Sequence, residues 1–312
     1  MNDQRIAILF AGQGAQAVGM GQDLAAKYPA AAQCFSRADE ILGRPLSALA
    51  FHGPEEELTR TKNCQPALYV HGLACLAALR TELGDFPIQA AAGLSLGEFT
   101  AHAAAGTFDF ETGLRLVAQR GLFMQDACEE TIGGMAAMIG GDESAVRALA
   151  AETDVDVANL NSPGQIVISG ESSKIALAVS RAKEHGIRLA KTLNVAGAYH
   201  SRLMDSAYLK LGEELEKTAF NTPRFPVICN VDAIPVRTPE EIRESLQDQV
   251  TGTVNWTQSI EYLIDQAGCE IFLELGPGGV LAGLVNRIRK GTPCLSIADC
   301  ASLDAALAAL RA

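Results

Sequence analysis

The chain has 312 residues, of which 48% are hydrophobic and 20% charged, so it can build a sizeable core and is neither disordered nor fibrous. Its 25 Lys and Arg against 37 Asp and Glu give a net charge of −12, which argues against a nucleic-acid partner. The eight cysteines form no C-x-x-C pair, and no apolar run is long enough to span a membrane. We therefore expect a cytoplasmic protein with reduced thiols, no metal site and no membrane association.

Short apolar runs alternate with amphipathic helical patterns along most of the chain. This alternation is typical of an α/β fold in which helices cover both faces of a parallel sheet. The pattern predicts strands at 5–10, 88–92, 225–229, 270–274 and 293–297, and helices at 64–83, 97–105, 110–127, 239–251, 257–267, 279–290 and 301–311.

One stretch, from residue 133 to residue 196, departs from this alternation. It predicts elements in the order strand 135–139, helix 142–152, strand 155–160, strand 165–169, helix 172–185 and strand 187–195. The order βαββαβ is the ferredoxin-like pattern. We predict a small ferredoxin-like subdomain at 133–196, inserted into a large domain made of 1–132 and 197–312.

Residues 93–97 read Gly-Leu-Ser-Leu-Gly and lie directly between the predicted strand 88–92 and the helix that follows. A G-x-S-x-G turn between strand and helix holds its serine in a strained conformation, and its glycines allow close backbone contact. The pattern predicts that Ser95 is a nucleophile at the carboxyl end of the sheet. A serine in an ordinary loop is the alternative.

A serine nucleophile needs a base, and the chain has five histidines. His200 follows a predicted strand and a glycine turn, at the kind of strand end where α/β proteins place their chemistry. The others lie in apolar helices, at a helix end or in a polar loop: His71, His102, His185 and His52. His200 is therefore the favoured base.

Arg120 lies in the middle of the apolar face of the predicted helix 110–127. An arginine cannot lose its charge by deprotonation, so burying it requires an anion. The anion is either a buried Asp or Glu or the carboxylate of a substrate. With a serine nucleophile nearby, the second reading points to transfer of an acyl group that carries a free acid.

Residues 12–17 read Gly-Gln-Gly-Ala-Gln-Ala and follow the first predicted strand. They match the G-x-G-x-x-A turn of dinucleotide-binding proteins, but the second strand with its acidic end is missing, because 30–42 has a helical pattern. The alternative is that this loop brings backbone N–H groups close to Ser95 as part of an oxyanion hole.

With these residues identified, the sequence resembles the malonyl-CoA:acyl carrier protein transacylases, the acyltransferases of fatty acid and polyketide synthesis. The resemblance spans nearly the whole chain and rests on Gly12-Gln-Gly-Ala-Gln16, Gln65-Pro-Ala67, Gly93-Leu-Ser-Leu-Gly-Glu98, Gln119-Arg-Gly121, Asn159-Leu-Asn-Ser-Pro-Gly-Gln165, Gly197-Ala-Tyr-His200, Val254-Asn-Trp256 and Glu274-Leu-Gly-Pro-Gly278.

The resemblance implies an α/β-hydrolase-like large domain, with the site in the groove beside the small subdomain. Ser95 would take the malonyl group from malonyl-CoA, His200 would be its base, and Arg120 would hold the malonyl carboxylate. The N–H groups of Gln13 and Leu96 would form the oxyanion hole. The acyl group would then pass to the phosphopantetheine thiol of an acyl carrier protein in a ping-pong reaction.

The resemblance assigns further roles in the same groove. Gln65 and Asn161 would bind substrate, and the main-chain carbonyl of Gln249 would orient the histidine. Most members carry His where this chain has Leu94. Tyr199 stands at a position that sets selectivity, and its ring should crowd an α-methyl group, which favours malonyl over methylmalonyl. The family also implies a monomer without bound cofactor.

Carrier proteins are acidic, as is this chain, so docking requires a local basic patch. The candidates are Arg287, Arg289 and Lys290, although basic residues also favour a helix C-terminus for structural reasons. Two other functions remain open. A serine thioesterase or esterase would share the G-x-S-x-G turn and the histidine, and it would release free acid. A non-catalytic carrier-binding protein would not need both Ser95 and His200.

Overall fold

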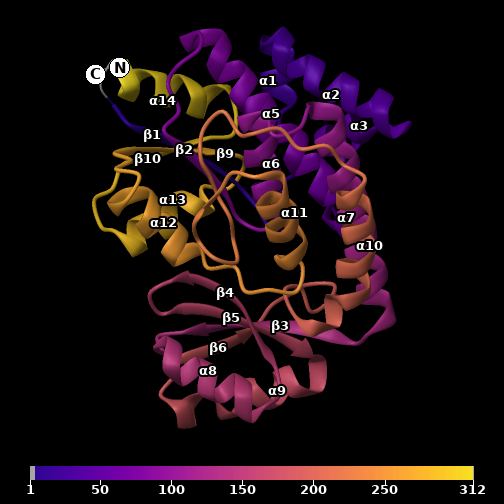
Figure 1. The fold of residues 1–312 in the computed structure, drawn as a ribbon, viewed down its shortest axis with the longest axis vertical. Coiled ribbons are helices and arrows are strands. Elements are labelled where there is room, and N and C mark those ends of the chain that lie inside the picture. Colours follow the sequence, from indigo (N-terminus) through magenta and orange to yellow (C-terminus); the bar gives the residue numbers. More distant parts are fainter. Residues whose placement is uncertain (1–3, 312) are drawn as a thin grey trace.

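Two β-sheets organise the computed structural model, which describes residues 4–311 (Figure 1). The larger sheet has the order β10-β9-β1-β2-β7-β8 and is parallel except for its edge strand β8, which runs antiparallel to β7. Its strands are β1 (Ile6–Phe10), β2 (Ala90–Gly93), β7 (Val227–Ile228), β8 (Pro235–Val236), β9 (Ile271–Leu275) and β10 (Cys294–Ile297). The α/β class and the parallel sheet are therefore confirmed, while β8 was not predicted.

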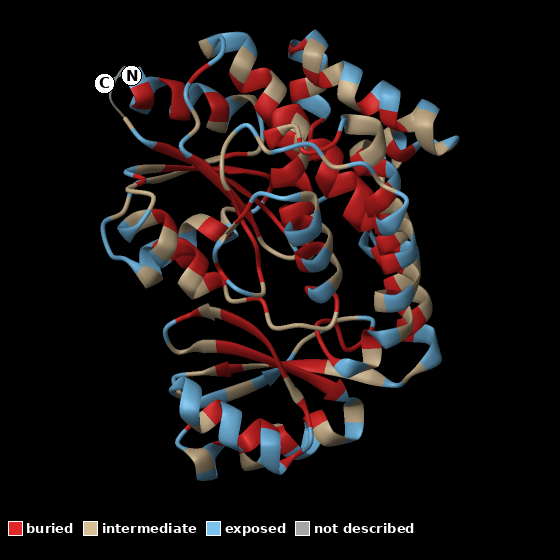
Figure 2. Cartoon of the chain, viewed as in Figure 1, coloured by how far each residue is buried: buried red, intermediate tan, exposed pale blue. Residues whose placement is uncertain are grey.

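Helices cover both faces of the larger sheet because its central strands are apolar on both sides. Along β1, Ile6, Ile8 and Phe10 join one core cluster, and Ala7 and Leu9 join another. The central strands are accordingly buried throughout (Figure 2). The first cluster includes helices α2 (Pro29–Leu42), α5 (Thr61–Leu83), α6 (Leu96–Ala105), α7 (Phe110–Glu130), α10 (Asp205–Glu216), α11 (Pro239–Asp248) and α14 (Cys300–Arg311). The second includes α12 (Trp256–Asp265) and α13 (Val280–Ile288).

The smaller sheet is antiparallel, with the order β4-β5-β3-β6. Its strands are β3 (Gly133–Ile139), β4 (Asp156–Ser162), β5 (Gln165–Glu171) and β6 (Leu189–Thr192). Helices α8 (Glu143–Glu152) and α9 (Ser172–Arg181) cover the face turned away from the rest of the molecule (Figure 1). A short 3₁₀ helix, Ala182–His185, follows α9.

The two sheets are joined through β4, whose backbone pairs with the segment before α12. The N–H of Leu160 donates to the carbonyl of Val254 at 2.9 Å, and the N–H of Val254 donates to the carbonyl of Ala158 at 2.8 Å. Buried backbone groups require such partners. This junction brings β4 beside the carboxyl ends of the larger sheet.

Helix α5 carries a proline inside its first two turns, where the missing N–H leaves one carbonyl without its helical partner. The proline is Pro66, and the carbonyl of Lys62 accepts instead from Nη2 of Arg44 at 3.0 Å. The helix starts at Thr61, earlier than the sequence pattern predicted, and carries Gln65 into the protein interior.

Several elements differ from the sequence-based prediction. The strand predicted at 187–195 pairs only over Leu189–Thr192, and the helix predicted at 239–251 ends at Asp248. His52, predicted in a loop, ends a short helix, and α10 has no counterpart among the helix ranges predicted above. The helices not given above are α1 (Gln22–Lys27), α3 (Leu46–His52) and α4 (Glu55–Thr59), with the 3₁₀ turn Arg202–Met204. Within residues 4–311, no helix is both long and apolar enough to cross a membrane.

Candidate active site

Ser95 lies at the sharp turn between β2 and α6, with φ 54° and ψ −109°. The turn is possible because its two glycines lack a Cβ. A Cβ on Gly93 would lie 1.9 Å from the carbonyl carbon of Gly97, and one on Gly97 would lie 2.2 Å from the carbonyl oxygen of Phe10. The backbone thus has the strained shape that the G-x-S-x-G pattern predicts.

His200 is the histidine that reaches Ser95. Its Nε2 lies 2.8 Å from Ser95 Oγ, and its Nδ1 lies 2.7 Å from the main-chain oxygen of Gln249. The carbonyl accepts a hydrogen bond from Nδ1–H, which leaves Nε2 unprotonated and able to take the proton of the serine. Burial, and then the charge of Arg120, lower the pKa of His200 to about 4. The imidazole is therefore neutral at neutral pH.

The four other histidines lie elsewhere in the fold. His71 contacts the carbonyl of Ala298, His102 contacts Thr107, and His185 pairs with Glu152. His52 is exposed at the end of α3.

Arg120 is buried in α7 with 1% of its surface exposed, as its position on the apolar helix face predicted. Its Nη1 donates to Gln65 Oε1 at 2.7 Å, and its Nη2 donates to Gln249 Oε1 at 2.6 Å and to Ser95 Oγ at 3.1 Å. All three acceptors are uncharged. Burial lowers the pKa of Arg120 to about 10, so the side chain stays positive at neutral pH.

A buried carboxylate, Glu98, lies behind these residues and was not identified from the sequence. Its Oε2 accepts from the N–H of Asn230 at 3.0 Å and from Nε2 of Gln249 at 2.9 Å, and Ser245 Oγ donates to its Oε1 at 3.4 Å. Asn230 Oδ1 in turn accepts from the N–H of Ser95 at 2.7 Å. Burial raises the pKa of Glu98, against the effect of these hydrogen bonds and of the Arg120 charge.

A pocket of about 470 Å³ opens in front of Ser95 and draws its walls from both sheets. Its lining comprises Gln13, Gly14, Gln16, Thr59, Gln65, Leu94, Ser95, Met124, Met135, Asn159, Asn161, Gln165, Val167, Leu193, Asn194, Val195, Ala196, Tyr199, His200, Val280 and Leu284. The pocket thus contains Gln65 and Asn161, the two side chains predicted to bind substrate. Gln65 holds Arg120, whereas Oδ1 of Asn161 is buried without a partner.

Tyr199 is fixed against the wall of this pocket. Its hydroxyl lies 2.5 Å from Thr61 Oγ1 and accepts from Nε2 of Gln13 at 3.3 Å. Burial raises the pKa of Tyr199, so the ring stays a neutral phenol.

Within the described residues, the main-chain N–H groups of Gln13 and Leu96 donate no hydrogen bond, and both remain free to bind an oxyanion.

The three basic residues at the end of α13 differ in their surroundings. Arg287 is exposed and donates to the side chain of Gln165, which lines the pocket. Arg289 pairs with Asp265 at 2.8 Å, so its charge is balanced locally. Lys290 is exposed at the chain turn beyond the helix. Only the first of them therefore combines an uncompensated charge with a position at the pocket.

Comparisons with known proteins identify the family of this chain. The model of the acyl transferase domain family matches residues 8–302. The chain is 40% identical over 312 residues to the malonyl CoA-acyl carrier protein transacylase of Bacillus subtilis (strain 168), covering 98% of each protein. An acyl carrier protein S-malonyltransferase from Vibrio cholerae aligns with a TM-score of 0.93 at 39% identity, over 97% of this chain and 100% of that one.

A further solved structure is described as a type II PKS acyl-carrier protein in complex with its malonyl-transacylase. It aligns with a TM-score of 0.94 at 39% identity, over 98% of this chain and 100% of that one. The protein is thus an acyltransferase of mixed α/β fold, and the chain belongs to the acyl transferase domain family. Within that family it is similar over nearly its whole length to malonyl CoA-acyl carrier protein transacylases, which confirms the resemblance found in its motifs.

Proposed function

We propose that this protein transfers the malonyl group of malonyl-CoA to the phosphopantetheine thiol of an acyl carrier protein. The observation that carries the proposal is the meeting of three groups at one oxygen. His200 Nε2 lies 2.8 Å and Arg120 Nη2 lies 3.1 Å from Ser95 Oγ. A nucleophile, its base and an anchor for a carboxylate are thus held at the same point.

In the first half-reaction, Ser95 Oγ attacks the thioester carbonyl of malonyl-CoA while His200 takes the serine proton. The N–H groups of Gln13 and Leu96 stabilise the oxyanion, and Leu96, the first residue of α6, adds the positive end of that helix. The carbon–sulfur bond then breaks, and His200 returns the proton to the leaving CoA thiolate. The products are malonyl-Ser95 and free CoA.

In the second half-reaction the same groups work in reverse order. The carrier's phosphopantetheine thiol gives its proton to His200 and attacks the ester carbonyl of malonyl-Ser95. The ester bond breaks, the serine oxygen regains the proton, and malonyl carrier protein leaves. The carbonyl of Gln249 holds the imidazole in place throughout, so no carboxylate is needed as a third member of the site.

Arg120 and Tyr199 account for the choice of acyl group. The guanidinium lacks a carboxylate partner in the described residues, and a malonyl carboxylate would supply it. An acetyl group would leave that buried charge unpaired. Tyr199, held by Thr61 and Gln13, would crowd an α-methyl group, so methylmalonyl-CoA is the poorer substrate.

Initial-rate kinetics with malonyl-CoA and holo-carrier protein test this proposal. A ping-pong transfer gives parallel lines in double-reciprocal plots, and the malonyl group is recovered on the carrier's phosphopantetheine. If free malonate formed at the same rate in the presence and in the absence of carrier protein, the protein would be a thioesterase. Carrier binding without any release of CoA would indicate a non-catalytic protein.

The architecture is part of the same proposal. We assign residues 133–196 to a ferredoxin-like subdomain inserted into an α/β-hydrolase-like domain of 1–132 and 197–312. Support comes from the element order β3-α8-β4-β5-α9-β6 and the sheet order β4-β5-β3-β6. The substrate groove would then lie between the two domains, with malonyl-CoA and the carrier entering from the same side.

A further inference from the structure

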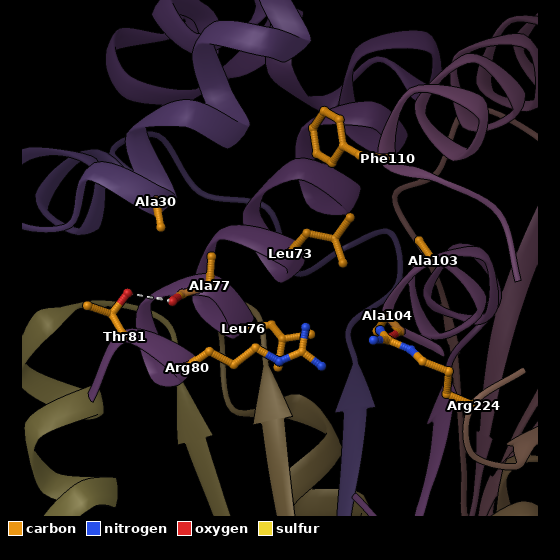
Figure 3. Close-up of a pocket in the computed structure, with 10 residues that line it drawn as sticks. All are labelled: Ala30, Leu73, Leu76, Ala77, Arg80, Thr81, Ala103, Ala104, Phe110 and Arg224. Atoms are coloured by element: carbon orange, nitrogen blue, oxygen red, sulfur yellow. Dashed lines mark hydrogen bonds between the residues drawn. The ribbon is translucent and has the colours of Figure 1, made fainter. Parts of the chain in front are cut away.

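A second pocket of about 470 Å³ lies away from the active site, between α5, α6 and the segment that follows α10 (Figure 3). It is lined by Ala30, Leu73, Leu76, Ala77, Arg80, Thr81, Ala103, Ala104, Phe110 and Arg224, none of which lines the active-site pocket. Its volume is within the range of about 300–1,000 Å³ that small-molecule sites occupy.

The two pockets lie toward opposite ends of the same two helices. Helix α5 carries Gln65 near its beginning, and α6 begins at Leu96, directly after Ser95. The second pocket is lined by the later parts of both helices, at positions 73–81 and 103–104. A ligand there would not touch the reacting groups.

Two arginines supply positive charge to this pocket. Arg224 is fixed, because its Nη2 donates to the carbonyl of Ala104 at 2.9 Å and its Nε to that of Ala105 at 3.3 Å. Arg80 extends toward the side of the pocket where Arg224 lies (Figure 3). Burial, and then the charge of Arg224, lower the pKa of Arg80, in keeping with this proximity.

Arg80 has no partner of its own. In the part of the chain that the structure describes, its guanidinium makes no hydrogen bond or ion pair, and its Nε is buried without an acceptor. An unpaired, half-buried guanidinium beside a second cation is unfavourable until an anion binds. The exposed Asp85 partly offsets the lowering of the Arg80 pKa but forms no ion pair with it.

The remaining walls are mostly apolar. Leu73, Leu76 and Phe110 provide the larger surfaces, and alanines fill the spaces between them. A simple inorganic anion would leave these walls exposed to water. An aliphatic chain would bury them, and burial gains about 25 cal/mol of free energy for each Å² of apolar surface. Phe110 lies on the side of the pocket away from the two guanidinium groups (Figure 3).

We propose that this pocket binds an amphiphilic carboxylate, with its head group between Arg80 and Arg224 and its aliphatic tail against Leu73, Leu76 and Phe110. The exposed Arg224 places the head group at the solvent side. The proposal concerns a site outside the acyl-transfer pocket and does not depend on the transfer reaction.

Calorimetric titration of the full chain with decanoate tests this proposal. We expect one saturable site in the native chain and affinity at least tenfold weaker in Arg80→Gln. Because Arg80 makes no hydrogen bond, this variant should keep the native melting temperature. Arg120→Gln is the matched control: it removes the active-site anchor for a carboxylate and should leave decanoate affinity at the second pocket unchanged.

Two further probes separate the parts of the ligand. Decanol, which keeps the tail but lacks the charge, should bind at least tenfold more weakly than decanoate, and inorganic phosphate should not compete at equal concentration. The proposal is overturned if decanoate does not saturate, if Arg80→Gln binds it as tightly as the native chain, or if only Arg120→Gln weakens it. Phosphate binding as tight as that of decanoate would also overturn it.

Discussion

Arg120 is the residue whose role the structure makes most specific. A buried arginine usually pairs with a buried carboxylate, yet here the guanidinium is shared among Gln65, Gln249 and Ser95, whose acceptor oxygens are uncharged. These hydrogen bonds fix the orientation of Nη1 and Nη2 but do not neutralise the charge of the guanidinium. An arginine held in this way is ready to bind a substrate carboxylate through a fork that a lysine cannot reproduce.

Arg120→Lys should therefore lower kcat/KM for malonyl-CoA by about 10²-fold, because disrupting a buried charge pair costs about 2–5 kcal/mol. The rate with acetyl-CoA should change far less, since acetyl has no carboxylate to lose. Steady-state kinetics with both thioesters measure the difference. Arg115→Lys, at an exposed position of the same helix, is the control. If kcat/KM fell equally for malonyl-CoA and acetyl-CoA, Arg120 would stabilise the fold of the site without binding the substrate carboxylate.

His200 predicts a pH dependence. Catalysis needs the neutral imidazole, and burial together with Arg120 lowers the pKa of His200 to about 4. As pH falls through that value, the imidazole gains a proton and can no longer accept one from Ser95. The acylation rate should be flat near neutrality and decline below about pH 4, as measured by stopped-flow release of CoA.

The same measurement on Arg120→Gln tests the cause of this shift. Removing the neighbouring positive charge should raise the pKa of His200 and move the acid limb to higher pH. The limb should still lie below the ordinary histidine value of about 6.5, because burial remains. An unmoved limb in this variant, or a native limb near 6.5, would contradict the assignment.

At the scale of elements, the site depends on how α6, β7 and α11 meet. Glu98 on α6 binds the N–H of Asn230, just after β7, and the side chain of Gln249, just after α11. Asn230 holds the N–H of Ser95, and Gln249 holds both Arg120 and His200. One buried carboxylate therefore joins the three elements that carry or orient the reacting groups.

Glu98→Ala should lower both kcat and the melting temperature, because it leaves the donors of Asn230 and Gln249 buried without an acceptor, at about 1–3 kcal/mol each. Glu98→Gln keeps one acceptor oxygen and should recover most of both quantities. Kinetics and thermal unfolding of the two variants provide the comparison. If the melting temperature of Glu98→Ala fell while its kcat stayed native, Glu98 would serve stability alone.

The sequence predicted those parts of the site that have a local signature. The elbow at Ser95 needs two glycines within five residues, and the place of Arg120 on an apolar helix face follows from helical periodicity. Glu98, Asn230 and the side chain of Gln249 carry no such signal, because the contacts of Glu98 with the other two span 132 and 151 positions of the chain. Glu98 could have been suspected as an acidic residue directly inside an apolar strand–helix junction.

The same distinction applies to the fold. Buried strands such as β1 and β9 were predicted closely, because continuous apolar runs bounded by turns identify them. Strand β8 has only two residues, and its pairing depends on β7 rather than on its own pattern. The end of β6 was misplaced because Leu193 and Val195 continue the apolar alternation of a strand, although residues 193–195 leave the sheet and line the pocket.

At the scale of the whole molecule, charge governs how a carrier protein approaches. A chain of net charge −12 repels an acidic partner, so docking must use a local excess of positive charge near the pocket. The pairing of Arg289 with Asp265 weakens its part in the predicted patch. Arg287, which contacts the pocket residue Gln165, is the stronger candidate, and the exposed Lys290 follows it in the chain.

Arg287→Glu should raise KM for the carrier protein about tenfold, equivalent to about 1.4 kcal/mol, and should alter KM for malonyl-CoA less. Arg289→Glu should have a smaller effect, because that charge is already balanced. Arg147→Glu, on α8 across the smaller sheet, is the control for charge reversal itself. If Arg287→Glu and Lys290→Glu both left KM for the carrier protein unchanged, this surface would not be the docking site.

The most direct test of the central claim is an intact-mass measurement after mixing the protein with malonyl-CoA in the absence of carrier protein. We expect a persistent adduct of one malonyl group on the native chain and none on Ser95→Ala. An adduct of equal yield on Ser95→Ala, or no adduct and no release of CoA from the native chain, would contradict this claim.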